Sequence, residues 1–231
     1  MFPKLLTAAS KENSLQLNSI LSSGLPWLKL DIKCPTFSQE ILDRAVKEST
    51  DWRSQWGFEG KDYDTNDWNG KILFGPKDWP AWVELIKPNI VIDDEDNLCK
   101  KHRHDVEFGW YVGPDHPVRQ WVNSFLDDDS INIVNYYVLP PNGYLHPHYD
   151  PCIGNKWLNK IYAAVKWPPG CEFGFLDWGN APINESDVFL INNYQYPHWV
   201  LNQGNENRIV LDIGCNLASI QDLIKRSFLG R

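Results

Sequence analysis

Short β-strand patterns separated by turn residues fill the second half of this 231-residue sequence. Runs rich in Val, Ile, Tyr and Phe end at turn-forming clusters such as Pro140-Pro141-Asn142-Gly143 and Pro168-Pro169-Gly170. Strands that recur about every ten residues are typical of antiparallel sandwiches and barrels. We therefore expect a mainly β core with six strands, at 131–139, 160–167, 171–178, 187–193, 198–202 and 207–214.

The first half of the sequence mixes helical patterns with loops rich in Trp, Asp and Gly. Apolar residues at helical spacing follow Ser38, Pro80 and Pro117, which are residue types that favour the start of a helix. A further amphipathic segment closes the sequence. The expected helices are 38–46, 78–86, 117–125 and 219–228, and one more strand is expected at 71–74.

Length and pattern together predict one structural domain with three parts. Residues 1–128 are expected to form an α+β extension that packs on the core. Residues 129–216 are expected to be the core itself, and residues 217–231 to add a C-terminal helix. Hydrophobic residues make up 42% of the chain, which is enough to bury a sizeable core.

The charge and the cysteine pattern restrict the functional class. The net charge of −8 disfavours nucleic acid and anionic membranes, because both attract basic surfaces. No apolar stretch reaches the roughly 18 residues of a membrane span. The five cysteines are scattered and form no C-x-x-C pair, which is typical of a reduced protein. We therefore expect a cytoplasmic protein with no nucleic-acid or membrane partner; the sequence leaves the oligomeric state open.

A set of possible metal ligands stands out against this background. His148 and Asp150 are separated by one residue, and His198 follows fifty positions later. Two imidazoles and one carboxylate suit a non-haem Fe(II) centre, because they occupy one face of an octahedral ion and leave three positions open. Arg208, ten residues after His198, adds a cation suited to a carboxylate of a bound co-substrate.

The expected strands bring these residues together. In an extended segment, His148 and Asp150 point to one face. If Gly204-Asn205 is a hairpin turn, His198 and Arg208 lie on adjacent strands and share one cavity. His146-x-His148 is an alternative ligand pair, but it lacks a carboxylate. His102 and His104 are expected in a polar loop, and His116 at a helix entry.

Three stretches, Gly143–Pro151, Lys160–Pro168 and Pro197–Asp212, resemble the aspartyl/asparaginyl β-hydroxylase family. The resemblance covers about residues 130–216. It implies a double-stranded β-helix of the jelly-roll, cupin-like type and an Fe(II)- and 2-oxoglutarate-dependent dioxygenase. Such an enzyme uses O₂ to hydroxylate a C–H bond of an amino-acid side chain and releases succinate and CO₂.

The resemblance also implies roles for particular residues. His148, Asp150 and His198 match the iron ligands, and Arg208 matches the partner of the far carboxylate of 2-oxoglutarate. Lys160 and Tyr137 are weaker matches to co-substrate contacts. Vertebrate members have Gly in place of Asp150, so in this respect the chain is more similar to the bacterial free-proline cis-hydroxylases of the same broad family.

Two other functional classes stay open. One is a non-catalytic β-barrel module that binds a metal, and Arg208 favours the dioxygenase over it. The other is a metal-dependent isomerase or lyase of cupin type, a class that usually needs more His ligands than this spacing offers. The substrate, a small molecule or a peptidyl side chain, is not fixed by the sequence. The Trp-rich segment that includes Trp52, Trp56, Trp68, Trp79 and Trp82 could line a substrate cleft or simply pack in the core.

Overall fold

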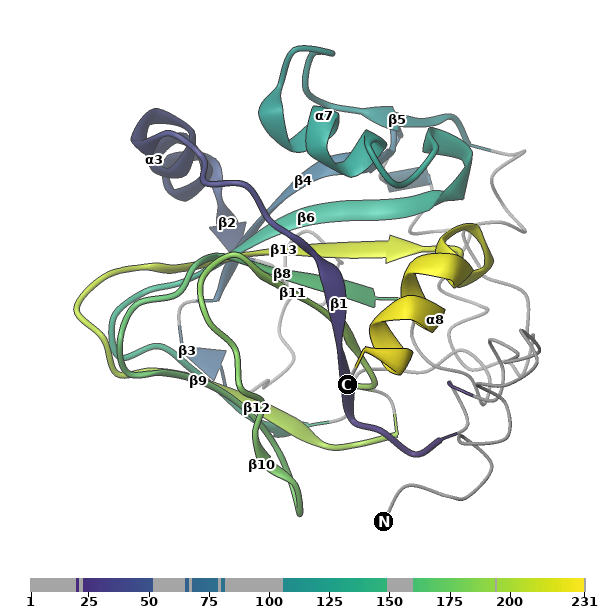
Figure 1. Ribbon diagram of the computed structural model, residues 1–231. Coiled ribbons are helices and arrows are strands. Elements are labelled where there is room, and N and C mark those ends of the chain that lie inside the picture. The colour runs from purple at the N-terminus through teal and green to yellow at the C-terminus, as the bar shows by residue number, and fades with distance from the viewer. Residues whose placement is uncertain are drawn as a thin grey trace.

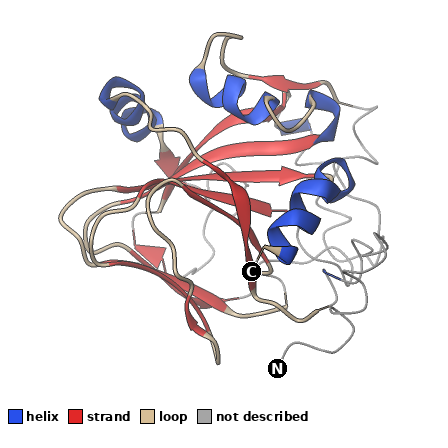
Figure 2. Cartoon of the chain, viewed as in Figure 1, coloured by secondary structure: helices blue, strands red, loops and turns tan. Residues whose placement is uncertain are grey.

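The computed structural model describes residues 20, 23–51, 65–66, 68–78, 80–81, 106–148, 160–193 and 195–230. Two antiparallel sheets form two layers that face each other, with helices on the outside of the larger layer (Figures 1 and 2). The expectation of a mainly β protein with flanking helices is confirmed.

Eight strands near the C-terminal end form the core by nested pairing. Strand β6 pairs with β13, β7 with β12, β8 with β11, and β9 with β10. This order, in which a long strand hairpin is folded over on itself, is the double-stranded β-helix. The strands are β6 (Ile131–Leu139), β7 (Tyr144–His148), β8 (Lys160–Lys166), β9 (Cys171–Phe175), β10 (Gly179–Asn180), β11 (Asp187–Ile191), β12 (His198–Asn202) and β13 (Arg208–Cys215).

Strands from the first half of the chain extend both sheets. The larger sheet has the order β1-β11-β8-β13-β6-β4-β2, with β5 on β4, and the smaller sheet has the order β10-β9-β12-β7-β3. The expected strand at 71–74 is the centre of β4. The added strands are β1 (Trp27–Lys33), β2 (Thr50–Asp51), β3 (Thr65–Asn66), β4 (Asn69–Pro76) and β5 (Phe108–Trp110).

In the described part of the chain, helices cover the outer face and one edge of the larger sheet (Figure 1). Helices α3 (Gln39–Glu48) and α7 (Pro117–Asn123) confirm two expected helices, and α8 (Gln221–Leu229) confirms the C-terminal one. Short 3-10 turns, η2 (Asp128–Ser130) and η3 (Leu217–Ile220), precede β6 and α8. Of the expected helix at 78–86, only Asp78, Pro80 and Ala81 are described; Pro80 and Ala81 are helical, and Asp78 lies in a bend before them.

Apolar side chains form one cluster on each side of the larger sheet. The outer cluster joins the sheet to the helices through residues such as Val118, Val134 and Ile224. The inner cluster lies between the two sheets and includes Phe173, Phe175 and Val210. Because side chains alternate along a strand, each central strand of the larger sheet contributes to both clusters.

Strand β7 was not expected as a strand, although it carries His148. Pro147 interrupts its pattern, and proline cannot donate a ladder hydrogen bond. The structure accommodates Pro147 at a bulge: between the pairs His198↔His148 and Val200↔Leu145, β7 has one residue more than β12.

The expected hairpin between β12 and β13 is wrong. Strand β12 pairs with β7 and β9 in the smaller sheet, whereas β13 pairs with β6 and β8 in the larger one. The turn at Gly204-Asn205 therefore carries the chain from one layer to the other. A turn pattern alone cannot distinguish this crossing from a hairpin.

Hydrogen bonds from one buried side chain hold this crossing. The Asn202 amide nitrogen donates to the carbonyl groups of Leu139, Pro140 and Glu206 at 2.9–3.0 Å. Its oxygen accepts from the Gly204 backbone N–H at 3.0 Å. The turns that link the layers therefore meet at one end of the core, on the left in Figure 1, which we call the closed end.

No helix in the part of the chain that the structure describes is long and apolar enough to cross a membrane. The described cysteines Cys34, Cys171 and Cys215 are free thiols.

Candidate active site

His148 and His198 lie side by side in the smaller sheet. They are register partners on β7 and β12, and their ring centroids are 4.3 Å apart. His198 is buried, and His148 is half-buried at the end of its strand. The two imidazoles are therefore close enough to bind one metal ion together.

A hydrogen bond within β7 sets the tautomer of His148. Its Nδ1 lies 2.6 Å from the backbone carbonyl oxygen of His146. Because a carbonyl oxygen can only accept, Nδ1 carries the proton, and the lone pair of neutral His148 is on Nε2. Metal-binding histidines usually hold their second ring nitrogen in this way. His146 itself is exposed and contributes its backbone.

Aromatic rings hold His198 in place. Its ring is stacked on Phe173 at 5.4 Å with an interplanar angle of 8°, and it lies 6.1 Å from the ring of Phe175. Phe175 is also its register partner on β9. These contacts restrict the imidazole to one orientation toward the space between the sheets.

The third expected ligand, Asp150, lies outside the described residues. Among the residues that are described, no three His, Cys, Asp or Glu side chains form a cluster that could hold a metal ion. The described part of the site therefore supplies two of the three expected ligands.

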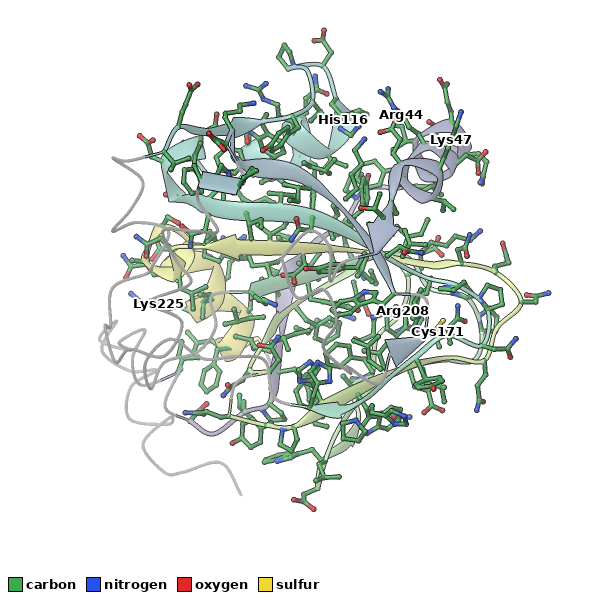
Figure 3. The ribbon with its side chains drawn as sticks, turned by 180° about the vertical axis from the view of Figure 1, so that it is seen from behind. Arg44, Lys47, His116, Cys171, Arg208 and Lys225 are labelled. Carbon is green, nitrogen blue, oxygen red and sulfur yellow. The ribbon has the colours of Figure 1, made fainter. Side chains whose placement is uncertain are left out.

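Arg208 is a buried cation at the closed end of the core. Only 1% of its surface is exposed, and Figure 3 shows it between the two sheets. Its Nε and Nη2 atoms have no hydrogen-bond partner among the described residues. Burial lowers the pKa of Arg208 to about 9, so the guanidinium still carries its charge at neutral pH.

Two aromatic rings hold the guanidinium. The Arg208 Cζ atom lies 4.7 Å from the ring centre of Trp167 and 5.5 Å from that of Tyr162. Such contacts stabilise a cation but satisfy none of its N–H donors. A buried, unsatisfied fork of donors is suited to a carboxylate, which can accept two hydrogen bonds from it at once.

A pocket between the sheets connects Arg208 with His198. Tyr137 lines the same pocket, is buried, and packs against Trp68 with ring centres 4.6 Å apart. Trp68 is the described member of the Trp-rich segment, and it does border the cleft; Trp52, Trp56, Trp79 and Trp82 lie outside the described residues. The pocket therefore brings together His198, Arg208 and Tyr137.

Lys160 lines this pocket from its other end. In the larger sheet Lys160 pairs with Gly214, whereas Lys166 pairs with Ile209, next to Arg208. Lys160 and Lys166 are six positions apart on β8, about 20 Å of extended strand. Lys160 Nζ lies 3.2 Å from the carboxylate of Asp212, whose side chain is 7% exposed.

Sequence reasoning missed Asp212, Tyr162 and Trp167 as parts of the site. One signal could have found Asp212: it is four residues after Arg208 on one strand and therefore faces the same side. The two aromatic residues carry no comparable signal, because Tyr and Trp are common in β cores.

Of the remaining histidines, only His116 is described, and it does not line the pocket. His116 is the residue before the first turn of α7, as expected for a helix entry. His102 and His104 lie outside the described residues.

Comparisons with known proteins give a fold-level likeness only. No protein-family model matches the sequence, and no curated protein matches it. A 2OG-Fe(II) oxygenase family protein from Burkholderia pseudomallei has a TM-score of 0.42 at 9% identity, covering 87% of this chain and 90% of that one. A viral collagen prolyl hydroxylase from Paramecium bursaria Chlorella virus-1, in complex with 2OG, has a TM-score of 0.38 at 16% identity, covering 83% and 96%.

A cupin 2 conserved barrel domain protein from Salinispora arenicola is also similar, with a TM-score of 0.27 at 17% identity, covering 41% of this chain and 71% of that one. At TM-scores this low, none of the three carries an argument about function. The resemblance to the aspartyl/asparaginyl β-hydroxylase family stays a prediction.

Proposed function

We propose that the protein is an Fe(II)- and 2-oxoglutarate-dependent dioxygenase that hydroxylates a C–H bond of an amino-acid side chain, either free or in a peptide. The observation that carries the proposal is Arg208: a buried guanidinium in the same pocket as His198, with two nitrogen atoms that have no hydrogen-bond partner in the described part of the chain. An unpaired buried charge destabilises a fold, so its presence needs a ligand of opposite charge.

The proposed metal ligands are His148, Asp150 and His198. The described geometry supports the two histidines, because their rings are adjacent and the Nδ1 proton of His148 is held by a carbonyl oxygen. Neutral imidazole and carboxylate are ligands that Fe(II) accepts. Bound Fe(II) would supply the activation of O₂ that C–H hydroxylation requires.

The chain itself would bind and orient the co-substrate. Arg208 would donate two hydrogen bonds to the far carboxylate of 2-oxoglutarate. The rings of Trp167 and Tyr162 would hold the planar guanidinium group in one position. Tyr137 would border the carbon chain of the co-substrate. The apolar side chains between the sheets would exclude water, which strengthens these charge-assisted bonds.

A non-catalytic metal-binding module is the alternative of another class. Such a module has no use for a buried cation beside its metal, and Arg208 therefore favours the enzyme. A metalloenzyme of another cupin type would need further ligands in the part of the chain outside the described residues.

Anaerobic titration with Fe(II) and 2-oxoglutarate tests the proposal. We expect a visible charge-transfer band in the wild type. In Arg208→Ala we expect the dissociation constant for 2-oxoglutarate to rise roughly a hundredfold, because the charged hydrogen bonds to its far carboxylate are lost. Arg226→Ala is the matched control, because Arg226 lies on α8 and is half-exposed. Absence of the band in the wild type, with the metal bound, would overturn the proposal.

A further inference from the structure

The pocket has a second charged position, at the end away from Arg208. Lys160 on β8 and Asp212 on β13 form an ion pair with 3.2 Å between Nζ and Oδ2, and both line the pocket that contains His198. Both charges are largely shielded from solvent, since the two side chains are 28% and 7% exposed. Because charges in such a place are costly, pocket-lining pairs of this kind are candidates for ligand recognition.

The strand geometry separates this pair from the proposed co-substrate site. Arg208 and Asp212 face the same side of β13, four residues apart, which is about 13 Å along an extended strand. Lys160 approaches Asp212 from the adjacent strand at the far end from Arg208. A molecule held by Arg208 and a molecule held by the ion pair would therefore approach the two histidines from opposite ends of the pocket.

A neighbouring buried amide adds an acceptor beside Asp212. Asn135 on β6 is the register partner of Asp212 and is 2% exposed. Its nitrogen lies 3.3 Å from the hydroxyl of Tyr137, and its carbonyl oxygen has no hydrogen-bond partner among the described residues. Asn135 and Asp212 therefore place an amide and a carboxylate oxygen side by side.

We propose that the Lys160–Asp212 pair binds the zwitterionic head group of a free α-amino acid; this inference rests on the proposed function. An ammonium group has three donors and a carboxylate has two oxygens, so side chains of these two types can contact more than one partner at once. The ligand's ammonium group would bind Asp212 and Asn135, and its carboxylate would bind Lys160. The amide groups of a peptide carry no charge to offer either side chain.

Direct binding to metal-free protein tests this assignment without any turnover. Isothermal titration calorimetry would compare the twenty free amino acids with their N-acetyl and C-amide derivatives. We expect at least one free amino acid to bind, and each blocked derivative to bind about a hundredfold more weakly, because a charged side chain would lose its partner. Equal binding of free and blocked forms, or of a peptide alone, would overturn the assignment.

A pair of variants tests the residues. Asp212→Asn keeps the shape and removes the negative charge. The double variant Lys160→Met/Asp212→Leu removes both charges, so that no unpaired buried charge is left to unfold the protein. We expect both variants to lose amino-acid binding while the Fe(II)/2-oxoglutarate charge-transfer band persists.

The two proposals fail in different ways. If the band is missing in the wild type, the dioxygenase proposal fails. If the band is present but the double variant loses 2-oxoglutarate binding and keeps amino-acid binding, the pair serves the co-substrate, and the head-group assignment fails.

Discussion

Arg208 illustrates at the scale of one residue how function and stability oppose each other. Its guanidinium is buried against Trp167 and Tyr162, and no described carboxylate neutralises it. Replacing Arg208 with Met keeps the apolar stem and removes the charge. We expect the free energy of unfolding without ligand to rise by about 1 kcal/mol or more, measured by urea denaturation. A clear loss of stability would mean that the charge is compensated in the free protein.

Asn202, by contrast, is a buried polar residue whose side chain has hydrogen-bond partners within the protein. Asn202→Ala would leave the carbonyl groups of Leu139, Pro140 and Glu206 without their shared donor. We expect a loss of about 2–4 kcal/mol in the free energy of unfolding, measured by urea denaturation. Asn205→Ala, at an exposed position in the same turn, is the control and should change stability little.

At this scale the sequence predicted residue types better than residue partners. His198 and Arg208 line one pocket, and His148 lies beside His198, although the expected hairpin was wrong. The partner of Lys160 was not predictable, because Asp212 meets it only through the pairing of β8 with β13. Cross-strand contacts depend on register, and register is set by the whole sheet.

Among the structural elements, β1 depends on one buried carboxylate for its attachment. Asp187 on β11 binds Lys29 at 2.8 Å and Lys33 at 2.6 Å, both on β1. Burial works against its ionisation, but the bonds from the two lysines and from the Asn184 backbone outweigh it and hold the pKa of Asp187 below its ordinary value of 3.8.

This depressed pKa gives the attachment of β1 a pH dependence. The stabilisation is complete above the pKa of the unfolded chain and is lost as the pH falls through the lower pKa of the folded state. We expect the difference in free energy of unfolding between the wild type and Asp187→Asn to be largest at pH 5–7 and to shrink at more acidic pH. Urea denaturation across this range would measure it, and a pH-independent difference would contradict the assignment.

The smaller sheet depends on a glycine for the packing of one indole. Trp199 on β12 lies across Gly174, its register partner on β9, and a Cβ atom at Gly174 would come within 2.1 Å of the indole. We expect Gly174→Ala to displace Trp199, which follows His198, and to cost about 1–3 kcal/mol in the free energy of unfolding. Trp199→Leu in the same background should recover part of that loss.

Strand and helix positions were mostly predictable, and the exceptions have physical reasons. The six expected core strands and the helices around α3, α7 and α8 follow from apolar periodicity. Strand β7 was not predicted because Pro147, which lies in its bulge, interrupts the strand pattern. Strand β10 was not predicted because its two exposed residues show no apolar alternation. The periodicity of one strand also cannot say which of two sheets it joins.

At the scale of the whole molecule, ligand binding should stabilise a fold that contains a buried charge. We expect 2-oxoglutarate to raise the melting temperature. At a concentration a hundredfold above its dissociation constant, the free energy of unfolding should rise by about 2.7 kcal/mol. 2-Oxobutyrate, which lacks the far carboxylate, should give little increase. Equal effects of the two acids in a thermal-shift measurement would exclude Arg208 as the anchor of that carboxylate.

The nested strand order has a consequence for how the chain acquires its pocket. Strand β6 is synthesised early in the core, but its partner β13 is synthesised last of the eight strands. Pairing of segments so distant in the sequence is slow. The chain must lose the conformational entropy of closing a large loop before the contacts between the two strands can form. While the ribosome still holds β13, the edges of β6 and β8 lack their shared neighbour and are open to wrong partners. Arg208 is the first residue of that last strand, so the charge enters the core only in the step that completes it.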